Sequence, residues 1–249
     1  MTGPAPARLY SDLAPWFHLI TPPREYVEEA DFIDRIIEAT RTGPARTLLE
    51  LGSGGGNNAS HLRGRYACTL TDLSPAMLER SRAINPGCEH LVGDMRSMRL
   101  GRLFDVVLVH DAIDYMTTEA DLRAAIGTVA AHMRPGGVAI VVPDDVLETF
   151  APGTSMGGDD GDDGRGARYL EWVHDIAPGA TTVEVDYVLA LREAGGPTRV
   201  EHDRHTLGLF PRATWDRLLA GAGLEPIAVD LEDPFAGEHV VLVARSPGW

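Results

Sequence analysis

The chain has 249 residues, 44% of them hydrophobic, and a formal net charge of −15 at pH 7. So acidic a chain is not expected to bind DNA or RNA, because nucleic-acid binding draws much of its affinity from neutralising phosphates. It is not expected to associate with membranes either, because no apolar run approaches the roughly 20 residues that a membrane-spanning helix requires.

The first predicted element is an amphipathic helix within residues 1–44. Thr21-Pro22 is typical of a helix start, and Gly43-Pro44 of a helix end. Between them, apolar side chains recur at helical spacing, at Val27, Ala30, Ile33 and Ile37. Aromatic side chains gather in the same region and belong either to the core or to a lid over a ligand. They are Tyr10, Trp16, Phe17 and Tyr26.

A glycine-rich turn follows the first strand. Leu48 to Leu51 form an apolar run, glycines stand at 52, 54 and 56, and a helix is expected near Asn57 to Leu62. Because Gly52 and Gly54 have no Cβ, the backbone can approach a ligand, and the helix start offers free N–H groups. A dinucleotide-binding turn would need glycine at position 57. The G-x-G-x-G spacing, with Glu50 two residues ahead, resembles motif I of class I S-adenosylmethionine (SAM) methyltransferases.

Strands and helices then alternate along the chain. The expected strands after the first are Tyr66–Thr71, His90–Val92, Phe104–Val109, Val138–Val142, Pro226–Leu231 and His239–Ala244. Ser74-Pro75 and the pair Thr118 and Asp121 are typical helix caps, and a further helix is expected at Arg212–Ala222. This alternation predicts an α/β fold with a doubly wound, mostly parallel sheet of seven strands.

Residues 167–210 are expected to form a three-stranded antiparallel insertion after the fifth strand. Its runs are Tyr169–Ile176, Thr182–Arg192 and Thr198–Phe210, separated by turns that contain glycine. The Gly- and Asp-rich stretch before it, Gly153–Gly166, is expected to be a long exposed loop. We expect one domain spanning residues 1–249, in which the insertion serves as a lid or as a dimer contact.

Two carboxylates follow strands at positions that suit an adenosine-containing ligand. Asp72 ends the second strand, where a carboxylate can accept both ribose hydroxyls, and Leu73 and Met77 follow it in a D-L-S-P-x-M-L string. Asp94 and the backbone of Met95, after the third strand, could meet the amine and a ring nitrogen of adenine. The alternatives are a solvated loop aspartate and an ordinary turn.

The segment from His110 to Tyr115 follows the fourth strand, at the sheet edge where such folds bind ligands. It lacks the [DNS]-P-P-[YFW] signature of enzymes that methylate amino groups of nucleic acids and peptides. His110 could orient the methionine end of the cofactor, act as a base, or be structural. Asp111 and Asp114 could hold a cationic amine or simply face water.

No metal site is expected. His202 and His205 are three residues apart, so strand alternation would place them on opposite faces. The run Asp159 to Gly164 has Arg165 where a calcium loop requires glycine. Cys68 and Cys88 are too few for a disulfide framework, which predicts a reducing, cytoplasmic setting.

Over nearly all its length the chain resembles small-molecule class I methyltransferases. Within them it is most similar to the N,N-dimethyltransferases that act on nucleotide-linked amino sugars in macrolide antibiotic pathways. The segments that carry the resemblance are Leu48–Gly56, Asp72–Leu78, Gly93–Arg96, Arg134–Val138 and His205–Arg212. The resemblance implies SAM as methyl donor, a lid-forming tyrosine for which Tyr10 is the candidate, and inserted strands that build the acceptor site or a dimer.

The expected function is methyl transfer from SAM to a small acceptor, an amine of secondary metabolism, with S-adenosylhomocysteine (SAH) as product. If the amine arrives protonated, His110 or Asp111 is the expected base. The expected cofactor site comprises Tyr10, Glu50, Gly52, Gly54, Asp72, Leu73, Met77, Asp94, Met95 and His110. An O- or C-methyltransferase and a non-catalytic SAM-binding module remain alternatives. The chain departs from the family at Asp111 to Tyr115 and in its acidic loop, and gives no support for the basic contacts that a diphosphate would need.

Overall fold

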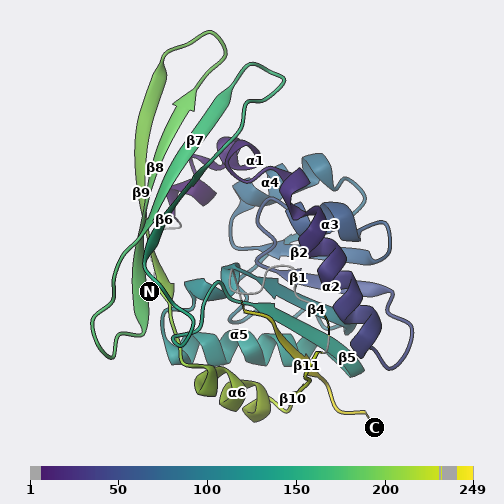
Figure 1. Ribbon diagram of the computed structural model, residues 1–249. Coiled ribbons are helices and arrows are strands. Elements are labelled where there is room, and N and C mark those ends of the chain that lie inside the picture. Colours follow the sequence, from purple (N-terminus) through teal and green to yellow (C-terminus); the bar gives the residue numbers. More distant parts are fainter. Residues whose placement is uncertain (1–6, 230, 232–239, 249) are drawn as a thin grey trace.

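The computed structural model of the protein describes residues 7–229, 231 and 240–248. Its main sheet has the strand order β10-β11-β5-β4-β1-β2-β3 (Figure 1). The strands are β1 (Thr47–Leu51), β2 (Ala67–Asp72), β3 (Glu89–Val92), β4 (Phe104–His110), β5 (Met133–Val142), β10 (Glu225–Pro226) and β11 (Leu242–Arg245). β1 to β5 pair in parallel, whereas β11 and β10 are antiparallel. The prediction of a doubly wound, mostly parallel sheet of seven strands is confirmed.

Helices cover both faces of this sheet (Figure 1). α2 (Val27–Thr40) and α3 (Asn57–Leu62) pack on one face, and α5 (Glu119–His132) and α6 (Arg212–Gly221) on the other. α4 (Pro75–Ile84) packs on β2 and β3. Because both faces are buried, the central strands are apolar throughout rather than alternating. Every helix in the described part of the chain is too short or too polar to cross a bilayer.

The predicted helix caps at the two central helices are confirmed. The Ser74 hydroxyl accepts a hydrogen bond from the Met77 N–H at the start of α4, and Thr118 does the same for Asp121 at α5. The first long helix starts later than expected. Residues 8–26 form short turns, η1 (Arg8–Tyr10), η2 (Ala14–Trp16), α1 (Phe17–Ile20) and η3 (Pro23–Tyr26), before α2 begins at Val27. Pro22 is extended, with ψ 135°, because the proline after it disfavours the helical conformation.

The inserted sheet has four strands, one more than predicted, in the order β6-β7-β8-β9. They are β6 (Gly153–Gly157), β7 (Gly166–Val173), β8 (Thr182–Arg192) and β9 (Thr198–Gly208), and they rise as an arm beside the main sheet (Figure 1). The expectation of a loop over Gly153–Gly166 was wrong for β6. This edge strand is held by main-chain pairing to β7, and its side chains are mostly exposed, so it needs no apolar pattern.

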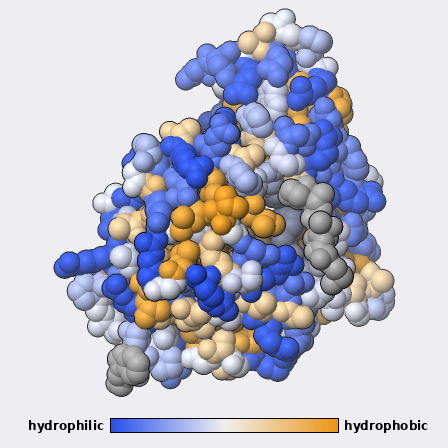
Figure 2. All heavy atoms as spheres, turned by 180° about the vertical axis from the view of Figure 1, so that it is seen from behind, coloured by the Kyte–Doolittle hydropathy of each residue, from blue (hydrophilic) through white to orange (hydrophobic). Residues whose placement is uncertain are grey.

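The two faces of the inserted sheet differ. Leu189 and Leu191 lie on the inner face and pack with Trp16 and other apolar side chains of the N-terminal segment. The outer face exposes apolar side chains, namely Met156, Leu170, Trp172, Val188 and Val200. Seen from behind, most of the molecule is hydrophilic, and one compact apolar group lies near the middle of that view (Figure 2).

The C-terminal strands are short. The predicted strand Pro226–Leu231 is reduced to pairing at Glu225–Pro226, with one further hydrogen bond from the Ile227 N–H to the Val243 carbonyl. The other predicted strand is found as β11, and His239, where it was expected to begin, lies outside the described residues.

Candidate active site

The glycine turn lies at the carboxyl end of β1, between β4 and β2, where the strand order reverses. A Cβ on Gly52 would lie 2.3 Å from the Cβ of Ala112 and 2.8 Å from the Cε of Met95. This glycine therefore lets the turns after β1, β3 and β4 meet. Gly54 has a φ of 52°, and a Cβ there would meet only ordinary contacts, with the Cε of Met77 at 3.6 Å. Its constraint is the left-handed backbone rather than crowding.

Asp72 braces this turn. Its Oδ2 accepts a hydrogen bond from the Gly54 N–H at 2.9 Å, and its Oδ1 accepts one from the Ser74 N–H at 2.7 Å. Burial raises the pKa of Asp72, and these two main-chain donors work in the opposite direction. The carboxylate thus joins the glycine turn to the start of α4, at the position where the sequence predicts ribose binding. Leu73, beside it, is 57% exposed and so is free to contact a ligand.

Glu50 carries a buried carboxylate with an unsatisfied atom. The residue is 3% exposed, and its Oε2 has no hydrogen-bond partner. Burial raises the pKa of Glu50 to about 8. A buried polar atom without a partner is costly, so this position beside the glycine turn suits a donor or cationic group of a ligand.

The N-terminal segment lies against the glycine turn. A Cβ on Gly55 would lie 2.6 Å from the Phe17 ring, and the His18 Nε2 lies 3.1 Å from the Gly55 carbonyl oxygen. The Tyr10 carbonyl accepts a hydrogen bond from the Ser74 hydroxyl at 2.5 Å. Of the two alternatives for the N-terminal aromatics, Trp16 belongs to the core, whereas Phe17 and Tyr10 adjoin the predicted cofactor site.

His110 ends β4 between two carboxylates. Its Nε2 lies 3.0 Å from Glu29 Oε1, and its Nδ1 lies 2.8 Å from Asp111 Oδ1. Burial lowers the pKa of His110, but Asp111 and Glu29 outweigh burial and raise this pKa well above its usual value. These two carboxylates therefore favour the imidazolium form of His110. Asp111 has a φ of 25°, a strained conformation for a residue other than glycine, and such strain is common at functional sites.

A group of acidic side chains extends from Asp111 along the same sheet edge. Asp114 is buried and accepts a hydrogen bond from the Asp144 N–H at 2.9 Å. Asp144 follows β5 and is exposed in the ligand-free protein, and desolvation together with the charges of Asp111 and Glu171 raises its pKa. Asp144 was not among the site residues predicted from the sequence. It could have been found by the rule that selected Asp72 and Asp111, because it also follows a parallel strand.

The inner face of the inserted sheet closes this region with residues that were not predicted for the site. The Tyr187 hydroxyl donates to Glu171 Oε1 at 2.5 Å. His205 Nδ1 lies 2.7 Å from the Tyr115 hydroxyl. As predicted, His202 and His205 lie on opposite faces, with side chains 57% and 1% exposed respectively.

Asp94 is already paired. It forms a 2.6 Å ion pair with Arg96, which lowers the pKa of Asp94, and Arg96 also reaches Asp121 at 3.1 Å. Met95 lies beside Gly52, as described above. Adenine binding by Asp94 and Met95 therefore stays a prediction.

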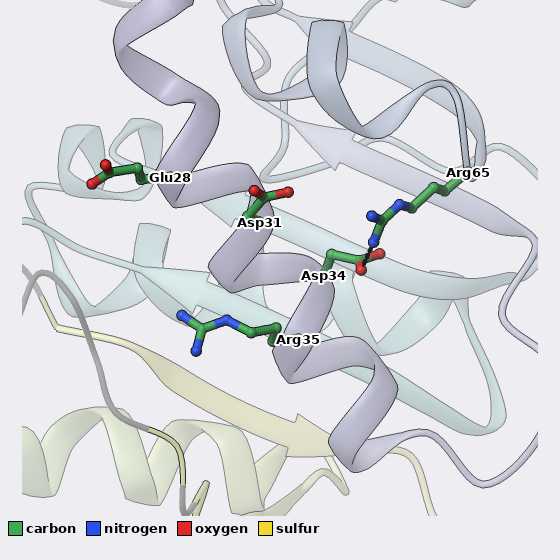
Figure 3. A pocket seen from close by; sticks show the side chains of 5 residues that line it. All are labelled: Glu28, Asp31, Asp34, Arg35 and Arg65. Atoms are coloured by element: carbon green, nitrogen blue, oxygen red, sulfur yellow. Dashed lines mark hydrogen bonds and ion pairs between the residues drawn. The ribbon is translucent and has the colours of Figure 1, made fainter.

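Other charged side chains form ion pairs at the surface. Asp160 pairs with Arg168 and Arg192, and Asp163 with Arg165, as expected for a solvated acidic loop. A pocket of about 460 Å³ lies beside α2 (Figure 3). It is lined by Glu28, Asp31, Asp34, Arg35 and Arg65. Arg65 precedes β2, so this pocket lies toward the amino end of that strand, away from the carboxyl edge where the predicted site residues gather.

Comparison with known proteins identifies the family. Residues 48–137 match the family described as "Methyltransferase domain". The dTDP-3-amino-3,4,6-trideoxy-alpha-D-glucopyranose N,N-dimethyltransferase of Streptomyces venezuelae is 33% identical over 204 residues, which are 81% of this chain and 84% of that protein. The chain belongs to the SAM-dependent methyltransferases. Within them it resembles the amino-sugar N,N-dimethyltransferases.

Solved structures agree with this assignment. The crystal structure of Streptomyces venezuelae DesVI has a TM-score of 0.81 at 28% identity and covers 96% of this chain and 98% of its own. SAM-bound CalS10, an amino pentose methyltransferase from Micromonospora echinaspora, has a TM-score of 0.75 at 26% identity and covers 98% and 99%. This methyltransferase is thus an enzyme that transfers a methyl group from SAM to a small-molecule acceptor.

The residues present fit SAM. The unpartnered oxygen of Glu50 suits the cationic amino group of the methionine part, and the glycine turn admits a ligand close to the backbone at Gly54. When bound, SAM supplies a methyl group that its positive sulfonium already activates. The protein therefore has to bind, orient and shield the reactants rather than generate a reactive species.

Proposed function

We propose that this methyltransferase N-methylates a small amine of secondary metabolism, and that amino sugars of the kind named for its relatives are the first acceptors to test. The observation that carries the proposal is the sign of the charge at the sheet edge. The groups that act most strongly on Asp144 are Asp111, His110 and Glu171, of which only His110 is cationic. An ammonium is attracted to such a site, whereas a carboxylate acceptor is repelled.

The donor side is assigned from the contacts above. Glu50 would hold the amino group of SAM. His110, whose two ring nitrogens are taken by Glu29 and Asp111, would border the methionine end of the cofactor. Asp72 would accept the ribose hydroxyls, for which its two main-chain donors keep it in place. Adenine and the neighbouring part of SAM would be contacted by Leu73, Met77, Asp94 and Met95. Gly52 and Gly54 would shape the turn. Tyr10 would close the site from the N-terminal segment.

Asp111 and Asp144 would hold the acceptor. Carboxylates that face an ammonium fix its position by charge and hydrogen bonding, which raises the effective concentration of the nucleophile at the methyl group. His110 holds Asp111 at 2.8 Å and is itself charged, so it positions this carboxylate rather than accepting a proton. The strained Asp111 backbone fits a residue whose carboxylate is aimed at a ligand.

Residues 1–44 would act as a lid and residues 167–210 as the wall of the acceptor site. The lid is supported by the contacts of Tyr10 and His18 with Ser74 and Gly55. The wall is supported by Glu171 and Tyr187, which lie on the inner face of the arm and act electrostatically on Asp144 and Tyr10. A lid that excludes water protects the transfer from side reactions.

We also propose that two copies pair through the outer face of the inserted sheet. Leu170 and Val188 are cross-strand partners there, and Met156 is the partner of Leu170 on the other side, so they form an exposed apolar row across three strands. Exposed apolar patches of this kind mark interfaces. The cytoplasm remains the proposed location, which the free thiols of Cys68 and Cys88 support.

The test is SAH release by the purified protein with paired acceptors. The panel has three parts. The first compares the amine, hydroxyl and carboxylate versions of one small molecule. The second is glucosamine, and the third is the set of dTDP-linked amino sugars named for the relatives. Turnover confined to amines supports the proposal. Turnover on hydroxyl or carboxylate acceptors alone overturns it in favour of O-methylation.

Asp144→Asn should raise the KM for an amine about tenfold or more, whereas Asp145→Asn, which removes a carboxyl group one residue further on, should not.

A further inference from the structure

A chain of hydrogen bonds crosses from the inserted sheet to the N-terminal segment. Asp203 Oδ2 lies 2.9 Å from His205 Nε2, His205 Nδ1 lies 2.7 Å from the Tyr115 hydroxyl, and that hydroxyl lies 3.0 Å from the hydroxyl of Tyr10. Asp203 and His205 are 6% and 2% exposed. None of the donor or acceptor assignments above uses either residue. Burying a carboxylate and an imidazole costs free energy, because both lose their contacts with water.

Strand alternation creates this arrangement. Asp203 and His205 are two apart on β9, so both side chains lie on its inner face. Asp203 Oδ2 also accepts a hydrogen bond from the Leu9 N–H at 2.8 Å, which fixes the carboxylate. A carboxylate on one ring nitrogen orients an imidazole and stabilises its protonated form, while the other nitrogen is left to exchange a proton. In this protein that other nitrogen faces Tyr115.

The chain can hold its protons in two ways. In the first, His205 is neutral, and its Nδ1 accepts the hydrogen of the Tyr115 hydroxyl, whose oxygen accepts from Tyr10. In the second, the His205 imidazolium donates from Nδ1 to Tyr115, which donates to Tyr10. The distances between the oxygen and nitrogen atoms suit both arrangements. The second arrangement holds one proton more than the first, and that proton enters at Tyr10.

We propose that Tyr10, Tyr115 and His205 form a relay that removes the proton of an ammonium acceptor before methyl transfer, with Asp203 as the carboxylate that positions His205. This inference rests on the amine acceptor of the proposed function. One N–H bond of the ammonium breaks and its proton passes to the Tyr10 oxygen. The Tyr10 proton passes to Tyr115, the Tyr115 proton passes to His205 Nδ1, and a new N–H bond forms there. The amine keeps its electron pair for the methyl group, and the proton returns to solvent by the same path after the product leaves.

Both ends of the relay lie near carboxylates. Asp111, Asp144 and Asp72 act electrostatically on Tyr10, so the relay begins beside the two carboxylates proposed to hold the ammonium. Tyr115 contacts the Tyr10 hydroxyl, and Tyr187 and Asp144 act on it electrostatically. The His205 ring lies among the rings of Tyr10, Tyr115 and Tyr187, at centroid distances of 5.6, 5.8 and 4.7 Å, with Asp203 as its carboxylate. His110 is not an alternative proton acceptor because each of its nitrogens already lies at a carboxylate.

The test is the pH profile of kcat and kcat/KM for Tyr115→Phe, which removes one oxygen from the middle of the relay and leaves Asp203 and His205 in place. The probes are glucosamine and the dTDP-linked 3-amino-3,4,6-trideoxyglucose. We expect a loss in kcat of about 100-fold near pH 7, within the usual range for assisted proton transfer. The loss should shrink about tenfold for each pH unit as the acceptor itself becomes a free amine, while the affinity for SAH stays unchanged.

Asp203→Asn is the second variant, because an amide oxygen can still accept from Leu9 but cannot stabilise an imidazolium. It should show a smaller loss with the same dependence on pH. Glu201→Gln is the matched control on the same strand, where Glu201 pairs with Arg8 at 3.0 Å, and it should leave the profile unchanged. A loss for Tyr115→Phe that is constant across pH, or no loss, would overturn the relay while wild-type turnover of amines keeps the proposed function. Failure of the wild type on both amines, with turnover of hydroxyl acceptors, would overturn both.

Discussion

Replacing Glu50 by glutamine should change how the stability of the ligand-free protein depends on pH. Burial gives this carboxyl a pKa of about 8, against an ordinary value of 4.5. Between these pH values the folded protein keeps a proton on Glu50 that the unfolded chain has released. The folded state therefore binds more protons, and the free energy of unfolding falls as the pH rises from 4.5 to 8. Glu50→Gln removes this contribution because glutamine does not titrate.

The size of the effect follows from the same interval. The difference between 4.5 and about 8 corresponds to at most about 5 kcal/mol, since one pKa unit is worth about 1.4 kcal/mol, and relaxation around the charge reduces this to about 2–4 kcal/mol. Urea unfolding of wild type and Glu50→Gln at intervals from pH 5 to pH 9 measures it. The variant should gain stability relative to wild type as the pH rises, while the contributions of other titrating groups largely cancel in the difference.

SAM extends the same experiment. The cationic amino group proposed for this position would favour the ionised form of Glu50, so binding below pH 8 should release a proton from the wild type. Calorimetric titrations in two buffers of different ionisation enthalpy count that proton. A stability difference between the two proteins that does not vary with pH would refute the assignment of Glu50 as a buried titrating group, and equal proton release by the variant would refute its role toward SAM.

The remaining predictions concern the turn, the ribose and the outer face of the arm. Asp72→Ala should weaken SAM binding by about 1–3 kcal/mol in a calorimetric titration, and unchanged affinity would remove the ribose assignment. Gly52→Ala should cost about 2–4 kcal/mol of stability in urea unfolding, because its Cβ would clash with Ala112 at a φ of 71°. Gly43→Ala, with nothing within 4 Å, is its control, and an equal loss in both would contradict the packing argument. Leu170→Glu should convert a dimer into monomers by light scattering with SAH affinity retained; a monomeric wild type would contradict the proposed pairing.

Local chemistry made much of the fold predictable. The glycine turn, the caps at Ser74 and Thr118 and the apolar central strands are each set by a few neighbouring residues, and the structure has them where the sequence placed them. β6 was missed because an edge strand is held by main-chain pairing, which leaves no pattern in its side chains.

The candidate site was predictable only where its residues lie at the carboxyl ends of parallel strands. Asp72, Asp94 and Asp111 follow parallel strands, and the sheet topology alone brings them to one edge. Glu171, Tyr187 and His205 reach the same region because the inserted sheet folds back over it, and sequence spacing does not encode that packing. Glu29 could not be predicted as a partner of His110 either, because it comes from α2, far from His110 in the sequence.

The double attachment of the N-terminal segment has a kinetic consequence. Tyr10 is held to Ser74 by its main chain and to Tyr115 by its side chain, so this short turn borders both the proposed donor site and the proposed acceptor site. SAM that enters at the glycine turn has to displace this segment. The acceptor site is complete only after the segment has returned to its place. The enzyme should therefore bind its substrates in a compulsory order, with SAM first. SAH should then be a competitive inhibitor with respect to SAM and a mixed inhibitor with respect to the acceptor.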